Sequence, residues 1–151
     1  LEHKALYNVS GEVEDGPMLP MGRSRLLRQG NDCLIITYSQ MARRALTVSD
    51  RLSERRGLHL GILDLRTLAP IDWDGVLEAT QRVGKVVIAE ECPIGTGVAD
   101  RIEVRIRRQF PSCHVETVHA KSGFVPFGPD EDRVLPGDID LEQACLRLTG
   151  T

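Results

Sequence analysis

The stretch "KVVIAEECPIGTGVADRI", residues 85–102, joins three patterns in a short span. An apolar, β-branched run ends in two glutamates, a glycine-rich turn follows, and apolar residues then recur at helical spacing. Strand, tight turn and helix in this order form the unit from which parallel sheets are built. Some chains use the same order to hold a phosphate at the start of the helix. The stretch therefore bears on both fold and function.

The same alternation extends outward from this segment. Continuous apolar runs predict buried strands at 32–39, 58–65, 85–91 and 113–119. The short segment 22–30 is bounded by glycines and rich in arginine, which suits an edge strand. Because helical patterns separate these strands, the expected fold class is an α/β sandwich on a mostly parallel sheet.

The helices between the strands have recognisable ends. Apolar stripes at helical spacing run through the segments after Ser39, Asp72 and Gly97, and through the last residues of the chain. We expect these helices to begin at polar caps and to end at glycines. The expected boundary residues are Ser39, Gly57, Asp72, Gly84 and, for the last helix, Asp138 or Asp140. A long loop, 120–137, precedes that helix.

Length and composition limit the classes of function. The 151 residues suit one domain, and a net charge of −3 gives no reason to expect nucleic acid or an anionic membrane as partner. The sequence has neither an apolar run long enough to span a bilayer nor a secretory signal pattern. Its four cysteines lie in or beside apolar segments without a CxxC pair, which favours a reducing compartment over disulfides or zinc.

The glycine turn is a poor match to a phosphate-binding loop. In Gly95-Thr96-Gly97-Val98-Ala99-Asp100, an aspartate stands where a dinucleotide fingerprint has its third glycine. Asp100, with Glu90 and Glu91 beside it, would repel a phosphate. Glu116 does lie at about the distance expected for a ribose-binding acid. We interpret the turn as a tight corner and keep an autonomous nucleotide-binding module as an alternative.

Other catalytic patterns are weak. The histidines show no metal-ligand spacing, although His119 ends a strand, where sites form in α/β proteins. Ser122 does not lie in a nucleophile elbow. We therefore predict no catalytic, cofactor-binding or metal-binding residue within this chain.

Charged residues form three candidate contact surfaces. Arg101, Arg105 and Arg108 would share one helix face, either solvated or in contact with a subunit. Asp64 and Arg66, at the end of a strand, could form a structural pair or contact a neighbouring domain. Acidic residues near the end of the chain could cap helices or dock a basic partner; the candidates for docking are Asp130, Glu131 and Asp132.

Four segments in the same order carry a family resemblance: "LEHKALY", "LPMGRSRLLRQGNDCLIITYSQM", "ILDLRTLAPID" and "VVIAEE". Between residues 1 and 110 the chain resembles the C-terminal domain of transketolase-like, thiamine-diphosphate-dependent enzymes. It is most similar to the β subunit of the decarboxylating component of 2-oxo acid dehydrogenase complexes. The resemblance implies a three-layer α/β/α sandwich on a five-stranded sheet whose first strand is antiparallel to the rest.

The resemblance also implies a role in a larger enzyme. Residues 1–21 would be a lead-in from an upstream thiamine-pyrimidine domain, and 22–151 the transketolase C-terminal-like domain. Thiamine diphosphate and Mg²⁺ would be held elsewhere in the full enzyme, so the domain alone would be inactive. The expected partners are the upstream domain and an α subunit, in a homodimer or heterotetramer. The expected compartment is the cytoplasm, or the mitochondrial matrix in a eukaryote.

Two readings stay open beside this one. In some relatives the domain helps dock the basic peripheral subunit-binding domain of an acyltransferase core, which the acidic cluster would suit. The run "GFVPFG", residues 123–128, is equally similar to the ends of transketolase or deoxyxylulose-phosphate synthase. A transferase of that kind is therefore one alternative, and a self-associating interaction module is another.

Overall fold

A computed structural model describes residues 3–11, 16, 18, 20–121, 123–126 and 128–151. The described residues form a five-stranded sheet in the order β1-β3-β2-β4-β5. Its strands are β1 (Arg25–Arg28), β2 (Cys33–Thr37), β3 (Leu60–Asp64), β4 (Lys85–Pro93) and β5 (His114–Ala120). All neighbouring pairs are parallel except β1 and β3. The mostly parallel sheet with an antiparallel first strand is thus confirmed.

Burial explains why the central strands lie where they do. All five residues of β2 are buried, as a strand covered on both faces requires. Ile35 lies opposite Ile62 of β3 on one side and Val87 of β4 on the other. Each such aliphatic side chain contributes about 1.5–3 kcal/mol when fully buried. The apolar continuity of these segments therefore fixes the centre of the sheet.

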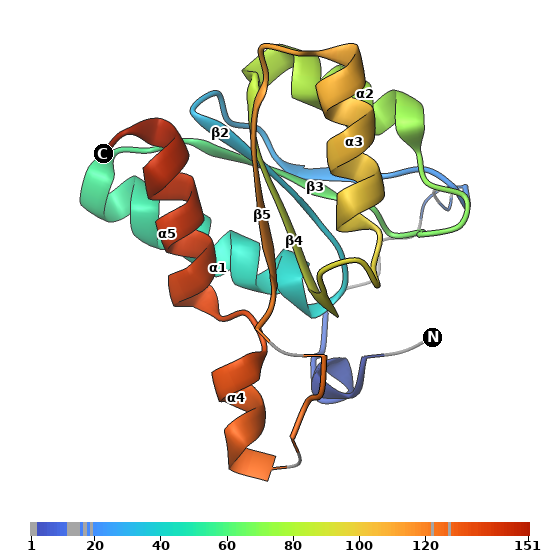
Figure 1. Cartoon of the computed structure of the whole chain (residues 1–151), viewed down its shortest axis with the longest axis vertical. Helices are drawn as coiled ribbons and strands as arrows, with labels where there is room; N and C mark the ends of the chain where they lie inside the picture. Colours follow the sequence, from blue (N-terminus) through green and yellow to red (C-terminus); the bar gives the residue numbers. More distant parts are fainter. Residues whose placement is uncertain (1–2, 12–15, 17, 19, 122, 127) are drawn as a thin grey trace.

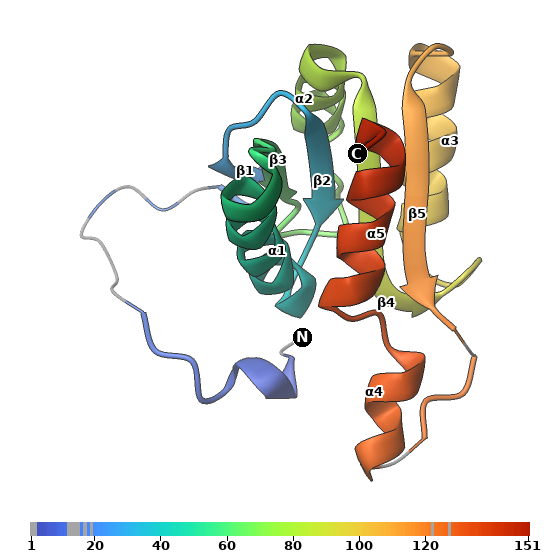
Figure 2. The same cartoon turned by 90° about the vertical axis from the view of Figure 1, so that its left-hand side faces the viewer.

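Helices cover both faces of the sheet, so the predicted three-layer sandwich is confirmed (Figure 1). On one face lie α1 (Gln40–Arg56) and α5 (Asp138–Thr149). On the other lie α2 (Trp73–Val83) and α3 (Ala99–Gln109). Figure 2, turned by 90°, shows α1 and α5 in front of the strands. The first apolar cluster includes Met41, Val48, Leu52, Leu141 and Cys145, and the second includes Val76, Ala99, Ile102 and Ile106.

Most expected helix boundaries are confirmed, although the capping hydrogen bond expected at the start of α1 is not formed. Gly57 and Gly84 end α1 and α2 in the left-handed conformation, and the Asp72 carboxylate accepts the Gly75 N–H at the start of α2. Ser39 holds the N-cap position of α1, but its side chain makes no capping hydrogen bond. Its φ of 57° removes it from the extended conformation that a capping serine normally adopts.

The long loop before the last helix holds more structure than expected. It contains a short 3-10 helix, η2 (Gly128–Asp130), and α4 (Glu131–Val134), which project beyond the sandwich (Figure 1). The N-cap of α5 is Gly137, which corrects the expected Asp138 or Asp140. Asp140 instead accepts the Gly137 N–H from the third helical position, at 2.8 Å.

The beginning of the chain also departs in part from the irregular lead-in that we expected. A single 3-10 turn, η1 (Lys4–Leu6), forms there, and the His3 side chain accepts the Ala5 N–H. Parts of the segment 1–21 lie outside the described residues, as do Ser122 and Phe127 of the loop 120–137. The proposed boundary between residues 21 and 22 stays a prediction.

Candidate functional site

The carboxyl ends of β2 and β4 are the natural place for a site in this topology. From β2 the chain passes to β3 on one side and later to β4 on the other, so the strand order reverses between β2 and β4. Open α/β sheets bind ligands outside such a reversal. Tyr38 follows β2 there, and its hydroxyl lies 3.3 Å from Glu90 Oε2 and 3.8 Å from Cys92 Sγ. Burial, then the sulfur and carboxylate beside it, raises the pKa of Tyr38, so the phenol stays neutral.

Glu90 is the buried centre of this region. Its side chain is 0% exposed, although it carries a carboxylate. Oε2 accepts the Val98 N–H at 2.9 Å, while Oε1 lies 3.5 Å from His119 Nδ1. The Nε2 of His119 lies 3.9 Å from Asp100 Oδ1. The imidazole of His119 thus lies between two carboxylates, beside the glycine turn.

The cluster of Glu90, His119 and Asp100 was only partly foreseen. From the sequence, His119 is predicted at a strand end and the carboxylates count only as local negative charge. Residue order does not give distances across a sheet, so their contact could not be predicted. Within the described part of the chain, Glu90 Oε1 and both ring nitrogens of His119 are buried without a hydrogen-bond partner. Tyr38 and Cys92 were not singled out at all. Their positions at the carboxyl ends of β2 and β4 were the available signal.

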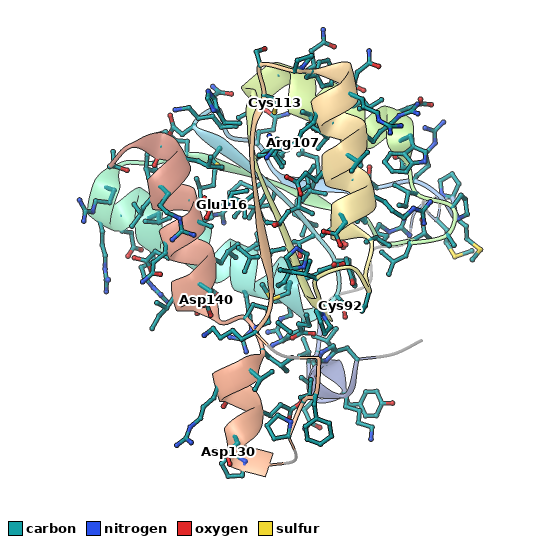
Figure 3. The ribbon with its side chains drawn as sticks, in the orientation of Figure 1. Cys92, Arg107, Cys113, Glu116, Asp130 and Asp140 are labelled. Atoms are coloured by element: carbon teal, nitrogen blue, oxygen red, sulfur yellow. The ribbon has the colours of Figure 1, made fainter. Side chains whose placement is uncertain are left out.

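The glycine turn is occupied by the protein's own carboxylates. Asp100 accepts the Gly95 N–H at 2.6 Å, and Glu90 accepts the Val98 N–H. A phosphate bound at this helix start would need these backbone donors. Glu116, the candidate ribose-binding acid, accepts a hydrogen bond from Nε of Arg147 on α5, at 2.7 Å. Figure 3 shows Glu116 on β5 beside α5. These contacts support the interpretation of the turn as a tight corner.

Beside this cluster, the carboxyl edge is hollowed by a space of about 940 Å³. Its lining residues include His3, Tyr38, Ser39, Asp64 and Arg66. His3 Nε2 lies 2.7 Å from Glu91 Oε2, which ties the described start of the chain to the end of β4. Among the described residues, Ser39 and Arg66 are the only non-glycine residues with positive φ, and both line this space. Strained backbone of this kind concentrates at functional edges.

The structure brings Asp64 and Arg66 together, but not through a guanidinium–carboxylate pair. The Asp64 carboxylate accepts the backbone N–H of Arg66 at 3.0 Å. The Arg66 guanidinium instead donates to the carbonyl oxygens of Arg23, at 3.0 Å, and Pro20, at 3.5 Å. Burial raises the pKa of Asp64. Arg66 therefore fastens the chain before β1 to the carboxyl edge.

The predicted basic ridge exists on α3. Arg101, Arg105 and Arg108 are all exposed, and a hollow of about 380 Å³ lies among them. Ile102 faces the core, as expected, and Glu103 pairs with Arg107. Whether the ridge contacts a subunit stays a prediction.

The acidic residues near the end of the chain separate into two groups. Asp138 binds Arg44 and Arg51 of α1, at 3.1 and 3.2 Å, and so joins α5 to α1. Asp130, Glu131 and Asp132 are exposed on the projecting segment, where Asp130 pairs with Arg133 at 2.9 Å. Figure 3 shows Asp130 far from Asp140. The first group is structural, and only the second is free to meet a partner.

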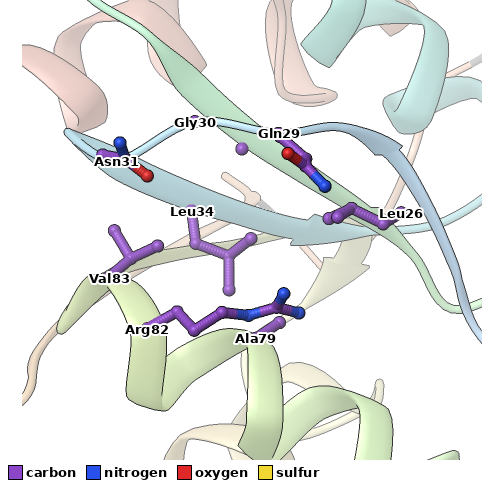
Figure 4. A pocket seen from close by; sticks show the side chains of 9 residues that line it. Leu26, Gln29, Gly30, Asn31, Leu34, Ala79, Arg82 and Val83 are labelled. Carbon is purple, nitrogen blue, oxygen red and sulfur yellow. The ribbon is translucent and has the colours of Figure 1, made fainter.

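Other parts of the described chain offer less chemistry. A cavity of about 120 Å³ lies at the opposite edge of the sheet, between the turn after β1 and α2 (Figure 4). Its lining combines aliphatic residues with the polar side chains of Gln29, Asn31 and Arg82. The described residues hold no group of three or more His, Cys, Asp or Glu able to bind a metal ion. Within the described ranges, no helix combines the length and apolarity needed to cross a membrane.

The family described as transketolase, C-terminal domain, matches residues 22–131. The chain belongs to this family. Its sheet order and three layers also match a solved structure, a "Split gene transketolase, inactive beta4 tetramer", with a TM-score of 0.81. That match covers 94% of this chain and 47% of the other at 23% identity, so it concerns the fold alone.

Curated relatives of this transketolase C-terminal domain are β subunits of larger enzymes. The chain is 34% identical to an acetoin:2,6-dichlorophenolindophenol oxidoreductase subunit β of Cupriavidus necator, over 97% of this chain and 44% of the relative. It is 30% identical to a 3-methyl-2-oxobutanoate dehydrogenase subunit β of Mycobacterium tuberculosis, with 97% and 44% covered. It is 31% identical to a pyruvate dehydrogenase E1 component subunit β of Bacillus subtilis, over 98% of this chain and 47% of the relative. The chain spans about half the length of these relatives.

The glycine turn does not fit a thiamine diphosphate with its metal ion. A diphosphate needs free backbone donors or cations, whereas the donors of the glycine turn already bind Asp100 and Glu90. We therefore derive no catalytic step through that group in this domain.

Proposed function

We propose that this chain is the C-terminal, assembly-supporting domain of the β subunit of a thiamine-diphosphate-dependent 2-oxo acid dehydrogenase. In this proposal the full enzyme oxidatively decarboxylates a 2-oxo acid, and the isolated domain is inactive. The observation that carries the proposal is the pattern of coverage. β subunits of two 2-oxo acid dehydrogenases and of one acetoin oxidoreductase match nearly all of this chain but only 44–47% of their own length. The remaining half of such a subunit would supply the upstream thiamine-pyrimidine domain.

The structure supports an accessory role for the domain. Its most buried polar cluster lies beneath a turn, with Glu90 at the centre, and Glu90 Oε2 accepts the Val98 N–H of that turn. The open features are surfaces: the hollow at the carboxyl edge, the basic face of α3 and the acidic projection at α4. Such surfaces suit contacts with other domains and subunits.

The partners follow from the same proposal. We infer contacts with the upstream domain, with an α subunit and, through Asp130, Glu131 and Asp132, with a basic segment of an acyltransferase core. The assembly would be a homodimer or an α₂β₂ heterotetramer. The described thiols are all free, which suits a reducing compartment such as the cytoplasm or the mitochondrial matrix.

The test uses the full-length β chain with its α subunit, thiamine diphosphate and Mg²⁺. We expect reduction of 2,6-dichlorophenolindophenol when pyruvate or 3-methyl-2-oxobutanoate is added, and none with the 151-residue chain alone. Micromolar binding of thiamine diphosphate to the 151-residue chain in calorimetry would overturn the proposal. Transfer of a two-carbon unit between sugar phosphates, without oxidation of a 2-oxo acid, would instead establish the transketolase or synthase alternative.

A further inference from the structure

The outward face of α3 carries arginines that form no ion pair within the described part of the chain. Arg101, Arg105 and Arg108 are exposed, and none of them forms an ion pair with a residue of the described ranges. Arg107, on the same helix, behaves differently. It binds Glu103 at 2.8 Å and donates to the Val115 carbonyl at 2.9 Å. The helix thus has one arginine that is bound within the fold and three that point elsewhere.

The three arginines surround a hollow with an apolar floor. The space of about 380 Å³ is lined by Trp73 of α2 and by Val104, which is 48% exposed, together with the arginines and Asp100. The Arg105 guanidinium lies 5.8 Å from the centre of the Trp73 ring. That contact fixes the ring and the cation together at the side of the hollow. An apolar side chain could enter here while its neighbours meet the arginines.

The spacing of the arginines selects among possible ligands. Residues 101, 105 and 108 follow a helical repeat and span about 10 Å along the axis. A small anion would meet one or two guanidiniums, whereas an extended acidic segment can meet all three. Arginine and tryptophan are also the residues that dominate protein interfaces. The net charge of the chain is −3, so the positive charge of this face is a local feature of opposite sign.

We propose that this face of α3 docks an acidic segment of a partner subunit, with carboxylates at helical spacing and one apolar side chain in the hollow beside Trp73. The inference deepens the assembly role proposed above and rests on it. It assigns to the basic face a partner opposite in charge to the one inferred for α4. The two surfaces therefore select partner segments of opposite charge.

The test measures peptide binding by the full-length β chain. One probe is a fluorescein-labelled helical peptide with glutamates at positions i, i+4 and i+7 and a leucine at i+3. A second peptide has the same composition with these positions scrambled. The test variant is R101Q/R105Q/R108Q. Its matched control is R43Q/R55Q/R56Q on α1, which removes the same charge from exposed arginines on the other side of the sheet.

We expect the patterned peptide to bind the unmodified chain and the α1 control with the same affinity. Its affinity for the α3 variant should be lower by about tenfold or more. Binding should weaken as salt rises. Equal binding by both variants, equal binding of the scrambled peptide, or no binding up to 1 mM would overturn the proposal. So would tighter α3-dependent binding of a single-stranded oligonucleotide, or self-association that the α3 variant abolishes, since either assigns the face to another partner. Dye reduction by the reconstituted enzyme, assayed in parallel, reports separately on the proposed function.

Discussion

The carboxylate of Glu90 lies in the space that a β-carbon at position 97 would occupy. Gly97 is therefore required by contact with a buried side chain and not by its own backbone angles, since its φ is not positive. Glu90 in turn holds the Val98 N–H. Gly97 leaves room for the buried Glu90 carboxylate, and that carboxylate holds the backbone of the turn.

Gly97→Ala should destabilise the fold by about 1–3 kcal/mol, because the added methyl group overpacks a buried region. Gly123 provides a control, since a β-carbon there would meet nothing within 4 Å. Urea unfolding of both variants measures the difference. A loss of stability in Gly97→Ala no larger than that in Gly123→Ala would contradict the close contact.

Asp72 joins the start of α2 to the chain before β1. Burial by itself would raise its pKa, but hydrogen bonds from the N–H and hydroxyl of Ser24 and from the Gly75 N–H, with Arg23 nearby, lower it overall. Because the folded pKa is lower than the unfolded value of about 3.9, the ionised carboxylate stabilises the fold above that pH. The contribution is lost as the pH falls through the folded pKa.

Asp72→Ala should therefore cost roughly 2–3 kcal/mol at pH 7, from the lost helix cap and the unpaired donors. Chemical denaturation at a series of pH values measures this cost. The difference between the parent chain and the variant should shrink below about pH 4. A difference that stays constant down to pH 2 would show that the ionised carboxylate is not the stabilising form.

Asp64 should show the opposite dependence. Burial raises its pKa in the fold, despite the Arg66 N–H and the nearby arginines. The folded state then binds a proton more readily than the unfolded state, so stability falls as the pH rises from the unfolded to the folded pKa. Asp64→Asn, which keeps an acceptor for the Arg66 N–H, should raise stability at pH 7 and leave it unchanged at pH 3. A variant less stable than the parent at pH 7 would contradict this sign.

The thiols should differ in reactivity. Contact with Cys33, then burial, raises the pKa of Cys145, and burial raises the pKa of Cys113. Cys92 is partly exposed at the carboxyl edge. Ellman's reagent added to the native chain should therefore modify one thiol quickly and the other three only after unfolding. Cys92→Ser should remove the fast phase, whereas a fast phase that persists in this variant would refute the assignment.

The sequence was sufficient for the sheet because the central strands are apolar on both faces. The continuous apolar runs of β2, β3 and β4 are typical of strands in the middle of a parallel sheet. The spacing of Arg101, Arg105 and Arg108 likewise needed only the helical period. Gly57 and Gly84 were identifiable because a left-handed end strongly favours glycine.

The features that escaped prediction depend on distances across the fold. His119 meets Glu90 only because β4 and β5 are adjacent and end together. The capping role expected of Ser39 failed because the chain turns sharply at the end of β2, which no residue pattern marks. The short helix α4 was missed because prolines and glycines dominate the surrounding loop. The link from Asp138 to α1 could not be predicted, because it depends on where the fold places Arg44 and Arg51.

The glycine turn after β4 is, in effect, an anion site whose anion is part of the chain. The oxygens of Asp100 and Glu90 accept the backbone N–H groups that a nucleotide-binding loop offers to a phosphate. The corner should thus keep one shape whether the cell is rich or poor in phosphate compounds. A domain that positions other subunits gains from this independence, because its geometry is decoupled from metabolite supply.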